Sequence, residues 1–370
     1  MNKISFCLPK IIFSNNSSNV LIKKIGKKKC IIFTSKYWKK SKLFKILNSN
    51  INFIKVINNI KPNPEIKTIF KTSLELKNVD IILCIGGGSV IDFTKAVLAF
   101  NAIEKNQEKF KEILFLGKKF NQVTAPKIIA VPTSSGTGSE VNSWGTIWHK
   151  GNKYSVSGRK LIPSEVIFDA NLSKTMPTSL TISSGLDALS HAIEAILNIN
   201  HNPIIDQIAM QAIEKIRKYL PLTLQRKNNT TYRRQMQQAA FLAGIAMSKT
   251  KTAICHSISY PLTSLYGLPH GIACSLTLPN ICQLNVKQYP ERTMIISRAM
   301  GCSNKNLEYS LINFFKSLKY KNYLKPIRKK DIDDSINFIN PARSKNSLVK
   351  ISNNDAVKIV KSSIKKFITS

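Results

Sequence analysis

The spacing of apolar residues changes near residue 175. Before that point, short and nearly continuous apolar runs alternate with stretches of helical period. Apolar runs of this length are typical of parallel strands that are buried on both faces. The expected strands are 29–34, 53–57, 80–85, 127–131 and 166–169, with a hairpin at 144–148 and 153–156; the expected helices are 41–48, 66–76 and 90–97.

Beyond Met176 and Pro177 the pattern is helical, with few strands. A chain of 370 residues exceeds the size at which a single core stops growing, so two domains are expected. The pattern predicts an α/β domain over 1–176 and a helical domain over 177–370. The helices expected in the second domain are 204–219, 233–247, 257–265, 273–282, 291–300, 307–318 and 354–367.

A glycine turn follows the most apolar strand. Gly86, Gly87, Gly88 and Ser89 lead directly into a helical stretch that contains Asp92. Glycines let a backbone approach a ligand closely, and the first N–H groups of a helix attract phosphate. A tight strand-to-helix turn without a ligand remains the alternative.

A second loop follows the strand at 127–131. Residues 132–139 are rich in hydroxyls and glycines, and include Thr133, Ser134, Gly138 and Ser139. A loop with so many hydrogen-bonding groups after a buried strand suits the phosphates or the amide of a nucleotide.

Asp187 and His191 are spaced to lie on one face of a helix, one turn apart. Alone, this pair is more often an ordinary surface pair than a metal site. His256 and His270 extend it to one carboxylate and three imidazoles, a set that suits Fe²⁺ or Zn²⁺ with an open position for substrate. His149 and His201, assigned to a hairpin tip and a loop, have less support.

The bulk composition excludes little. A net charge of +36 is compatible with nucleic-acid or anionic-membrane binding, but lysines are scattered and no nucleic-acid motif is present, which favours a compositional bias at surface positions. Seven cysteines without a CxxC spacing indicate reduced thiols in a cytoplasmic protein. No apolar run is long enough to span a membrane, and Met1–Cys7 does not resemble a signal peptide.

Four segments together resemble the iron-containing (group III) alcohol dehydrogenase family over nearly the full chain, and the tail at 340–346 resembles the family's C-terminal region. The segments are Gly86–Ser89 with Asp92 and Lys95; Pro132–Thr133 through Gly136–Glu140; Gly185–Glu194; and His256 with Pro269–Gly271.

The resemblance implies a Rossmann-like dinucleotide-binding domain and an all-α metal domain, the architecture shared with dehydroquinate synthase, with the site between them. It places Asp187, His191, His256 and His270 on the metal-ligand positions, with Fe²⁺ or Zn²⁺ as the ion. The glycine turn corresponds to the pyrophosphate site of NAD(H) or NADP(H), and the second loop helps to hold that cofactor. A homodimer is the family expectation.

Two departures concern the substrate. Many members carry a further histidine four residues after the first late ligand, where this chain has Tyr260, so a proton-relay role or a pocket-lining role is open. Lys249 and Lys251 stand where most relatives have an uncharged stretch. The run Lys249–Tyr260 is similar to the phosphonoacetaldehyde reductase (hydroxyethylphosphonate dehydrogenase) branch, in which the lysines would hold an anionic group. Two more lysines in a lysine-rich chain are the alternative.

Ser35 and Lys36 follow the strand at 29–34, where many NAD-preferring relatives have an acidic residue. An acidic residue there repels a 2′-phosphate, so NADPH is expected to be tolerated.

The predicted activity is reduction of an aldehyde to a primary alcohol, with phosphonoacetaldehyde and 2-hydroxyethylphosphonate as the expected pair. A general alcohol dehydrogenase or lactaldehyde reductase acting on neutral aldehydes is the alternative. A metal- and nucleotide-binding protein without turnover, a nucleic-acid binder, and a glycerol-type or sugar-phosphate cyclising relative are the remaining hypotheses.

Overall fold

The computed structural model describes residues 7–72, 74–118, 126–325, 327 and 332–368. The chain divides into two compact units. The N-terminal unit contains the residues up to Ser134 together with Ser139–Ser173, and the C-terminal unit contains Ser135–Gly138 together with Lys174–Ser370. The interpretation of Met1–Cys7 falls almost entirely outside the described residues.

The N-terminal unit is built on a parallel sheet with strand order β1-β8-β5-β4-β2-β3. Strands β2 and β4 are buried along their whole length, as expected for central strands covered on both faces. A separate antiparallel hairpin is formed by β6 and β7. The strands are β1 (Lys10–Ser14), β2 (Cys30–Thr34), β3 (Phe53–Ile57), β4 (Ile81–Gly86), β5 (Lys127–Pro132), β6 (Trp144–His149), β7 (Asn152–Ser157) and β8 (Glu165–Asp169).

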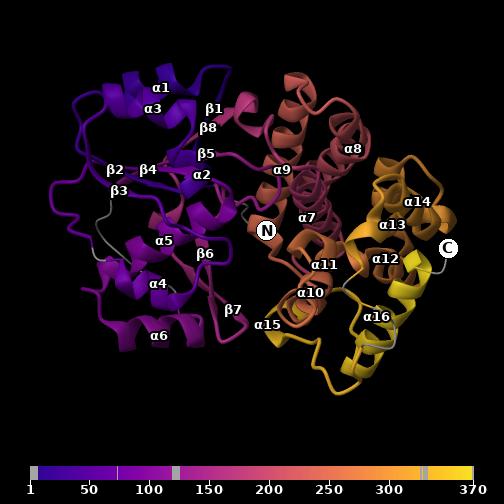
Figure 1. The fold of residues 1–370 in the computed structure, drawn as a ribbon. Helices are drawn as coiled ribbons and strands as arrows, with labels where there is room; N and C mark the ends of the chain where they lie inside the picture. The colour runs from indigo at the N-terminus through magenta and orange to yellow at the C-terminus, as the bar shows by residue number, and fades with distance from the viewer. Residues whose placement is uncertain (1–6, 73, 119–125, 326, 328–331, 369–370) are drawn as a thin grey trace. The chain divides into compact units, whose positions relative to one another are not determined.

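Helices cover both faces of this sheet: α1 and α3 lie on one side, and α4, α5 and α6 on the other (Figure 1). The alternate side chains of β2 and β4, among them Ile32 and Leu83, form one core with Leu21 of α1 and Leu47 of α3. The helices of this unit are α1 (Ser17–Ile25), α2 (Lys36–Lys39), α3 (Lys42–Asn50), α4 (Ile66–Lys71), α5 (Gly88–Ala102) and α6 (Gln107–Leu116), with 3-10 turns at Arg159–Leu161 and Ala170–Ser173.

The C-terminal unit is helical, and α7 (Thr178–Ile196) runs through its middle. Every residue of α7 from Thr181 to Ile196 is buried, because α8, α9 and α11 pack around it. The other helices are α8 (Pro203–Gln225), α9 (Thr230–Thr250), α10 (Ile254–Ser264), α11 (His270–Leu276), α12 (Leu278–Gln288), α13 (Pro290–Met300), α14 (Leu307–Ser317), α15 (Pro341–Ser344) and α16 (Asn353–Ile368), with 3-10 turns at Asn304–Asn306 and Tyr320–Tyr323.

Several elements differ from the sequence prediction. Strand β1 has only three consecutive apolar residues, Ile11, Ile12 and Phe13, and none of its residues is fully buried because it is an edge strand; the prediction missed it. Helix α4 ends at Lys71, before the predicted end at 76. The single helix predicted at 273–282 is wrong: two helices meet at Thr277, and Pro279 lies in the first turn of the second, where its missing N–H does no harm.

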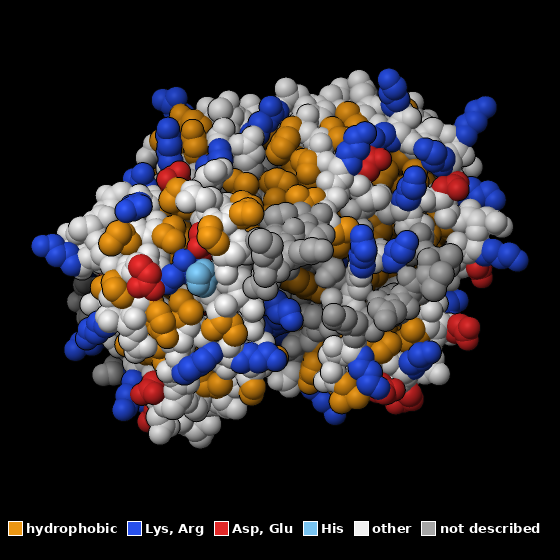
Figure 2. Space-filling view, turned by 180° about the vertical axis from the view of Figure 1, so that it is seen from behind, with side chains coloured by type: hydrophobic (Ala, Val, Ile, Leu, Met, Phe, Trp, Pro, Cys, Tyr) orange, Lys and Arg blue, Asp and Glu red, His pale blue; other side chains and the backbone are white. Residues whose placement is uncertain are grey.

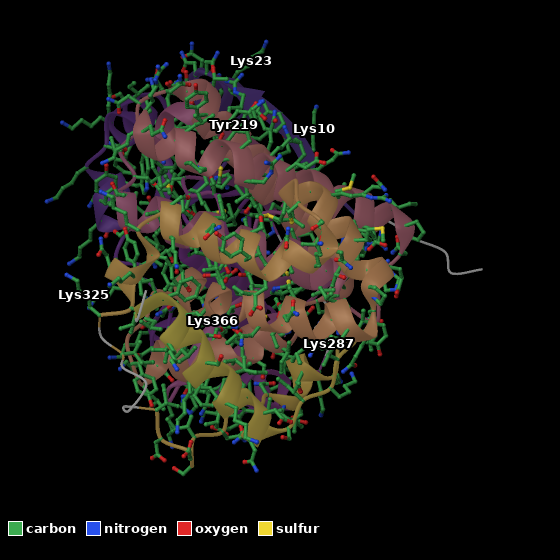
Figure 3. The ribbon with its side chains drawn as sticks, turned by 90° about the vertical axis from the view of Figure 1, so that its right-hand side faces the viewer. Lys10, Lys23, Tyr219, Lys287, Lys325 and Lys366 are labelled. Carbon is green, nitrogen blue, oxygen red and sulfur yellow. The ribbon has the colours of Figure 1, made fainter. Side chains whose placement is uncertain are left out.

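The positive charge is spread over the surface. Figure 2 shows Lys and Arg side chains scattered across one face among few acidic ones, without one dense patch. In Figure 3, Lys10, Lys23 and Lys325 lie at the outer edge of the molecule. Among the described residues, no helix combines the length and apolar character needed to cross a bilayer. The distribution of charge is that of solvated side chains over most of the surface.

Candidate functional site

Asp187 and His191 lie on the buried middle of α7, one turn apart, with Asp187 Oδ1 3.7 Å from His191 Nε2. Only 4% of Asp187 is exposed, so its carboxylate has been removed from water. A buried carboxylate requires compensating positive charge or hydrogen bonds. The predicted pair is therefore an internal one and not the surface pair that was its alternative.

Glu194, one turn beyond His191 along α7, holds the start of α10. Its carboxylate accepts hydrogen bonds from the backbone N–H groups of Ala253, Cys255 and His256, at 3.0, 2.5 and 3.2 Å. It also accepts one from Nδ1 of His256 at 2.5 Å. Since Ala253 offers no capping side chain, Glu194 supplies the acceptor that the first turn of α10 needs. The same contact orients the His256 ring.

Helix α11 approaches α7 unusually closely at Gly271. A Cβ atom at Gly271 would lie 1.8 Å from the carbonyl oxygen of Ser183 and 2.9 Å from the backbone nitrogen of Asp187. Only glycine permits this approach of one helix backbone to another. It brings His270, the first residue of α11, to a position where its Nε2 lies 4.0 Å from Oδ1 of Asp187. The Pro-His-Gly sequence thus has a direct structural reason.

The three helices bring donor atoms together around one point. Nε2 of His256 lies 3.5 Å from Oδ1 of Asp187, and the rings of His191 and His256 stack with centroids 4.6 Å apart. The side chain of His270 is 25% exposed, whereas those of Asp187 and His256 are almost fully buried. His270 therefore marks the open side of the cluster.

The cluster contains polar atoms that no described residue satisfies. Oδ1 of Asp187 and Nε2 of His256 are buried and make no hydrogen bond within the described part of the chain. A neutral His256 that donates its Nδ1 proton to Glu194 presents a lone pair at Nε2. Two electron-rich atoms 3.5 Å apart are the arrangement that a divalent cation would satisfy, so the residues present fit a metal ion.

Burial opposes protonation of His256, but interactions with Cys274 and the two carboxylates outweigh it and hold the pKa of His256 well above its usual value, so a metal ion bound at Nε2 would displace a proton. Burial opposes ionisation of Asp187, but the surrounding imidazoles of His191, His256 and His270 outweigh it and hold the pKa of the carboxyl below its usual value. Burial also opposes ionisation of Glu194, and His256 and the backbone N–H groups together lower its pKa. Both carboxylates are therefore charged at neutral pH.

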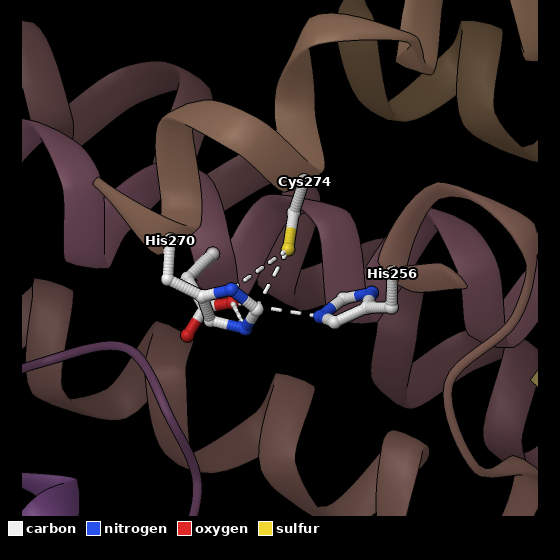
Figure 4. Close-up of side chains that lie close together, drawn as sticks. His256, His270 and Cys274 are labelled. Carbon is white, nitrogen blue, oxygen red and sulfur yellow. Dashed lines mark hydrogen bonds and ion pairs between the residues drawn. The ribbon is translucent and has the colours of Figure 1, made fainter. Parts of the chain in front are cut away.

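Cys274 is a member of the cluster that the sequence reasoning missed. Its Sγ lies 3.6 Å from Nε2 of His270, one turn earlier on α11 (Figure 4). One ligand atom from each of Asp187, His256, His270 and Cys274 lies within 4.8 Å of the others. The i, i+4 spacing from His270 was the only signal in the sequence, and it is weak because such spacings are common on helices.

In the N-terminal unit, the glycine turn and the second loop leave the sheet side by side. Gly86 is the last residue of β4 and pairs with Pro132 of β5, and the Thr133 N–H donates to the Gly86 carbonyl at 3.0 Å. The carboxyl edge of a parallel sheet is the usual place for a nucleotide. Gly87 is the N-cap of α5 and provides no side-chain acceptor, so the N–H groups of Gly88 and Ser89 in the first turn suit a phosphate.

The remaining residues of the second loop are confined by their neighbours. Thr133 and Ser139 are buried and Ser134 is half-buried, so their hydroxyls lie at the edge of the sheet and not in bulk water. Gly138 has a φ of +61°, and a Cβ there would lie 2.5 Å from the Cα of Gly244 on α9, inside the C-terminal unit. That position requires glycine both for its conformation and for space.

Lys95 of α5 fastens this loop from inside the N-terminal unit. Its Nζ donates to the carbonyl oxygens of Ser139, Asn142 and Trp144 at 2.6, 2.7 and 3.1 Å, and contacts the side-chain oxygen of Asn142 at 3.0 Å. The side chain has no exposed surface. A cation buried this completely needs such partners, and in return it fixes the course of the loop.

Burial perturbs the acids and bases around Lys95. It lowers the pKa of Lys95 to about 8 and raises that of Glu140 to about 7. It also raises the pKa of Asp92, the half-buried residue in the second turn of α5. In each case loss of water around the charged form is the largest cause.

The residues predicted to meet the substrate lie on two successive helices, α9 and α10. Tyr260 lies one turn after His256 on α10, and its hydroxyl accepts a hydrogen bond from Nε of Arg343 at 3.2 Å. Lys249 is half-buried in the last turn of α9. Lys251 is exposed at the C-cap of α9, with a φ of +67°. Arg343 is a second residue that the sequence reasoning did not assign to the site.

The other two histidines lie elsewhere. His149 ends β6, where its ring lies 5.5 Å from that of Phe115. Nδ1 of His201 lies 3.6 Å from a carboxylate oxygen of Asp206, and Asp206 also pairs with Arg292. Neither contributes to the cluster around Asp187 in the described residues.

Comparison with known proteins adds a family to this geometry. The family model described as "Iron-containing alcohol dehydrogenase" matches residues 9–170, and that described as "Fe-containing alcohol dehydrogenase family, C-terminal" matches residues 181–363. The chain is 32% identical over 329 residues to an NADPH-dependent butanol dehydrogenase from Clostridium saccharobutylicum, with 85% of this chain and 84% of the relative covered.

Solved structures agree in fold along almost the whole chain. An alcohol dehydrogenase from Oenococcus oeni superposes with a TM-score of 0.85 at 26% identity, covering 98% of this chain and all of the other. A sulfoacetaldehyde reductase from Bifidobacterium kashiwanohense, in complex with NAD⁺, superposes with a TM-score of 0.84 at 25% identity, covering both chains completely. The fold, the two family matches and the identity to curated relatives together show that this chain belongs to the iron-containing alcohol dehydrogenase family.

Proposed function

We propose that this protein is a metal-dependent NAD(P)H oxidoreductase that reduces a short aldehyde bearing an acid group, with phosphonoacetaldehyde reduced to 2-hydroxyethylphosphonate as the preferred reaction. The observation that carries the metal-dependent part is the pair of buried, unsatisfied atoms on Asp187 and His256. The observation that carries the acidic substrate is the contact between Arg343 and Tyr260.

Asp187, His191, His256 and His270 would hold the divalent ion, with Fe²⁺ as the expected ion and Zn²⁺ as the alternative. When bound, the ion would supply a Lewis acid for the carbonyl oxygen, and the reduced nicotinamide would supply the hydride. Glu194 keeps His256 in the tautomer that presents Nε2, and Gly271 permits the approach that positions His270. The side chain of His270 is partly exposed, so a substrate could approach the cluster from that side.

The nucleotide would use the N-terminal unit. Gly86–Ser89 would receive the pyrophosphate, and Thr133, Ser134, Gly138 and Ser139 would line the loop that holds the remainder, with Asp92 behind the turn. Ser35 caps α2 by accepting from the Trp38 N–H, and Lys36 is exposed beside it. An uncharged hydroxyl and a lysine after β2 accept a 2′-phosphate, which favours NADPH, and the butanol dehydrogenase relative is named as NADPH-dependent.

Arg343 is well placed to recognise an anionic group. It is half-buried, and Nε is its only nitrogen that donates to a described residue, so the two terminal amino groups remain available for an acid group. The hydrogen bond from Arg343 to Tyr260 holds the guanidinium against α10, and Tyr260 lies one helical turn after His256. A planar guanidinium binds two oxygens of one phosphonate or sulfonate.

The segment that carries Arg343 is held firmly against α10. Ser257 Oγ accepts from the Asn340 N–H at 2.5 Å and donates to the Phe338 carbonyl at 3.0 Å. Ser347 Oγ accepts from the Ile254 N–H at 3.2 Å. These bonds fix the segment beside the same helix that presents His256, so Arg343 is positioned more tightly than the exposed Lys251. The half-buried Lys249 stays a second contributor.

Tyr260 would complete the reaction by providing a proton to the alkoxide oxygen. Its hydroxyl accepts from Arg343 and carries a proton of its own, which a phenol can donate. The nearby guanidinium also stabilises the phenolate that remains after transfer. Tyr260 therefore takes the place of the histidine that many relatives carry at this position.

Reduction of neutral aldehydes is the second candidate function. It is favoured by the curated relatives, which are named for butanol, 1-propanol, methanol and 1,3-propanediol. The similar structure of a sulfoacetaldehyde reductase, an enzyme named for an anionic aldehyde, supports the first candidate instead. The acidic and neutral aldehydes are similar in size, so the charge of the substrate is what distinguishes the two candidate functions.

The test measures NADH and NADPH oxidation with phosphonoacetaldehyde, sulfoacetaldehyde and propanal, after loading the metal-free protein with Fe²⁺ or Zn²⁺. We expect metal-dependent turnover, with kcat/KM highest for an acidic aldehyde. His270→Ala should abolish it. Activity of the wild type in metal-free buffer, or of His270→Ala at the wild-type level, would contradict the metal assignment.

The acidic substrate is tested with Arg343→Met, which keeps an unbranched apolar side chain and removes the guanidinium group with its charge. KM for phosphonoacetaldehyde should rise about 10- to 100-fold, because a charged hydrogen bond is lost, while KM for propanal changes little. Lys251→Ala should have a smaller effect in the same direction. Lys345→Met, an exposed neighbour, is the matched control. An equal effect of Arg343→Met on both aldehydes would remove the anionic-substrate proposal.

A further inference from the structure

The cluster around Asp187 contains one more donor than the ligand set in the proposed function uses. Besides one carboxylate and three imidazoles, it holds the thiol of Cys274, which is fully buried and points at the same centre (Figure 4). Its Sγ lies 3.6 Å from Nε2 and 3.7 Å from Nδ1 of His270. Oδ1 of Asp187 and Nε2 of His256 converge there without hydrogen bonds from the described residues, which independently marks a place for a cation.

Two separations between donors match those of a tetrahedral site, and the others are close to it. Bond lengths of about 2.0–2.2 Å to nitrogen or oxygen and about 2.3 Å to sulfur require neighbouring donors to lie about 3.3–3.6 Å apart. His256 Nε2 lies 3.5 Å from Asp187 Oδ1, and Cys274 Sγ lies 3.6 Å from His270 Nε2. His270 Nε2 lies 4.0 Å from Asp187 Oδ1, and all four ligand atoms lie within 4.8 Å of one another. Small rotations of the side chains would close that difference.

We propose that Cys274 is a thiolate ligand for zinc, and that the cluster can bind a metal through two different ligand sets. This inference rests on the metal site of the proposed function. With Zn²⁺, the ligands are Asp187, His256, His270 and Cys274, and His191 is left outside. With Fe²⁺, the oxygen and imidazole set that includes His191 is used. On binding Zn²⁺ the thiol loses its proton to solvent and its sulfur forms the metal bond, with no change of oxidation state.

The chemistry of the ions supports this division. Thiolate is a soft donor that Zn²⁺ and Co²⁺ accept readily in a tetrahedral site, whereas imidazole and carboxylate also suit Fe²⁺. Four protein ligands fill a tetrahedral zinc site and leave no position for a carbonyl oxygen. The zinc form is therefore expected to turn over more slowly than the iron form, and Cys274 is a residue that determines which metal supports activity.

The test uses Co²⁺ as a spectroscopic substitute for Zn²⁺ in the metal-free full-length protein. We expect the visible bands of tetrahedral cobalt together with an intense thiolate-to-cobalt absorption in the near ultraviolet. Cys274→Ser should lose the near-ultraviolet band, and its zinc affinity should fall by at least the 10- to 100-fold that loss of an orienting partner causes. Cys302→Ser, a partly exposed thiol outside the cluster, is the matched control and should keep the band.

Two outcomes are distinguishable. Cobalt binding without the near-ultraviolet band, or a band that survives in Cys274→Ser, would overturn the role of Cys274 and leave the proposed function standing. A wild-type protein that binds neither cobalt nor zinc would overturn both. Should Cys274→Ser fail to fold, X-ray absorption of the zinc-loaded wild type decides: a sulfur scatterer is expected, and a shell of nitrogen and oxygen alone would overturn the proposal.

Discussion

Two buried polar clusters, one in each unit, differ in whether their atoms are satisfied. In the N-terminal unit, Lys95 is completely buried and its ammonium group is surrounded by four oxygen atoms. In the C-terminal unit, Asp187 and His256 are nearly as buried, yet Oδ1 and Nε2 make no hydrogen bond to a described residue. Burial of a polar atom without a partner costs about 1–3 kcal/mol. Protein oxygens satisfy the ammonium of Lys95, although Oδ1 of its neighbour Asp92 makes no hydrogen bond to a described residue; in the second cluster the two unsatisfied atoms converge on one point, which suits a cation.

This difference changes how conspicuous sequence features are interpreted. Lys95 and Asp92 belong to the segment that resembles a nucleotide site, but Lys95 acts on the backbone of the second loop and not on a ligand. Asp187 and His256 carry weaker individual signals, and they converge on an incomplete site. The state of the hydrogen bonds, more than the presence of a charged residue, separates a positioning residue from a binding residue.

The largest expected effect comes from removing the buried ammonium group from the first cluster. Lys95→Met removes the ammonium donor from three backbone carbonyls and from the Asn142 side-chain oxygen, which still accepts from the Trp144 N–H. We expect a loss of about 3–5 kcal/mol in the free energy of unfolding, because a buried partner has been removed, together with weaker NADPH binding. Urea unfolding and fluorescence titration measure both. Lys45→Met on the exposed face of α3 should be neutral, and equal stability of the two variants would contradict the positioning role.

A pH effect is expected from Glu140 in the same cluster. Burial raises its pKa from 4.5 to about 7. The folded protein therefore holds this proton more tightly than the unfolded chain, so the contribution to stability is full below pH 4.5 and is lost as the pH rises to about 7. This shift corresponds to about 3 kcal/mol.

Glu140→Gln removes the titrating group and keeps its shape. The free energy of unfolding, measured by urea denaturation between pH 4.5 and 7, should fall less steeply with pH in the variant than in the wild type. Glu75→Gln, an exposed carboxylate, is the control and should leave the slope unchanged. A slope that is identical in wild type and Glu140→Gln would show that Glu140 is not protonated in the folded state.

The smallest expected effect concerns Glu194, whose carboxylate orients His256 in the second cluster. Glu194→Gln keeps the volume of the side chain but weakens its hold on Nδ1 of His256 and on the first turn of α10. Loss of such an orienting partner costs about 10- to 100-fold in metal affinity. Competition with a chelator measures the affinity for Zn²⁺. The exposed Glu214→Gln on α8 is the control, and an unchanged affinity in Glu194→Gln would mean that the ring of His256 does not depend on it.

Much of the fold follows from local pattern. Strands β2, β4 and β5 are short apolar runs buried on both faces, and the turn of Gly86–Ser89 with the helix after it is a local strand-to-helix signal. The edge strand β1 and the break at Thr277 between α11 and α12 were not predictable in this way. The apolar run of β1 is only three residues long, and apolar residues at helical spacing continue on both sides of the break, where Pro279 is compatible with a helix start as well as with a helix end.

The sequence by itself determined which donor types are present, the order of the family's segments along the chain, and the helical face shared by Asp187 and His191. Only the tertiary structure decided that Cys274 belongs with His270 and Asp187, that Arg343 reaches Tyr260, and that Glu194 caps α10. Each of these contacts depends on how helices pack, including the approach of α11 to α7 that Gly271 allows. A side chain that acts through packing at a distance along the chain leaves no periodic signal in the sequence.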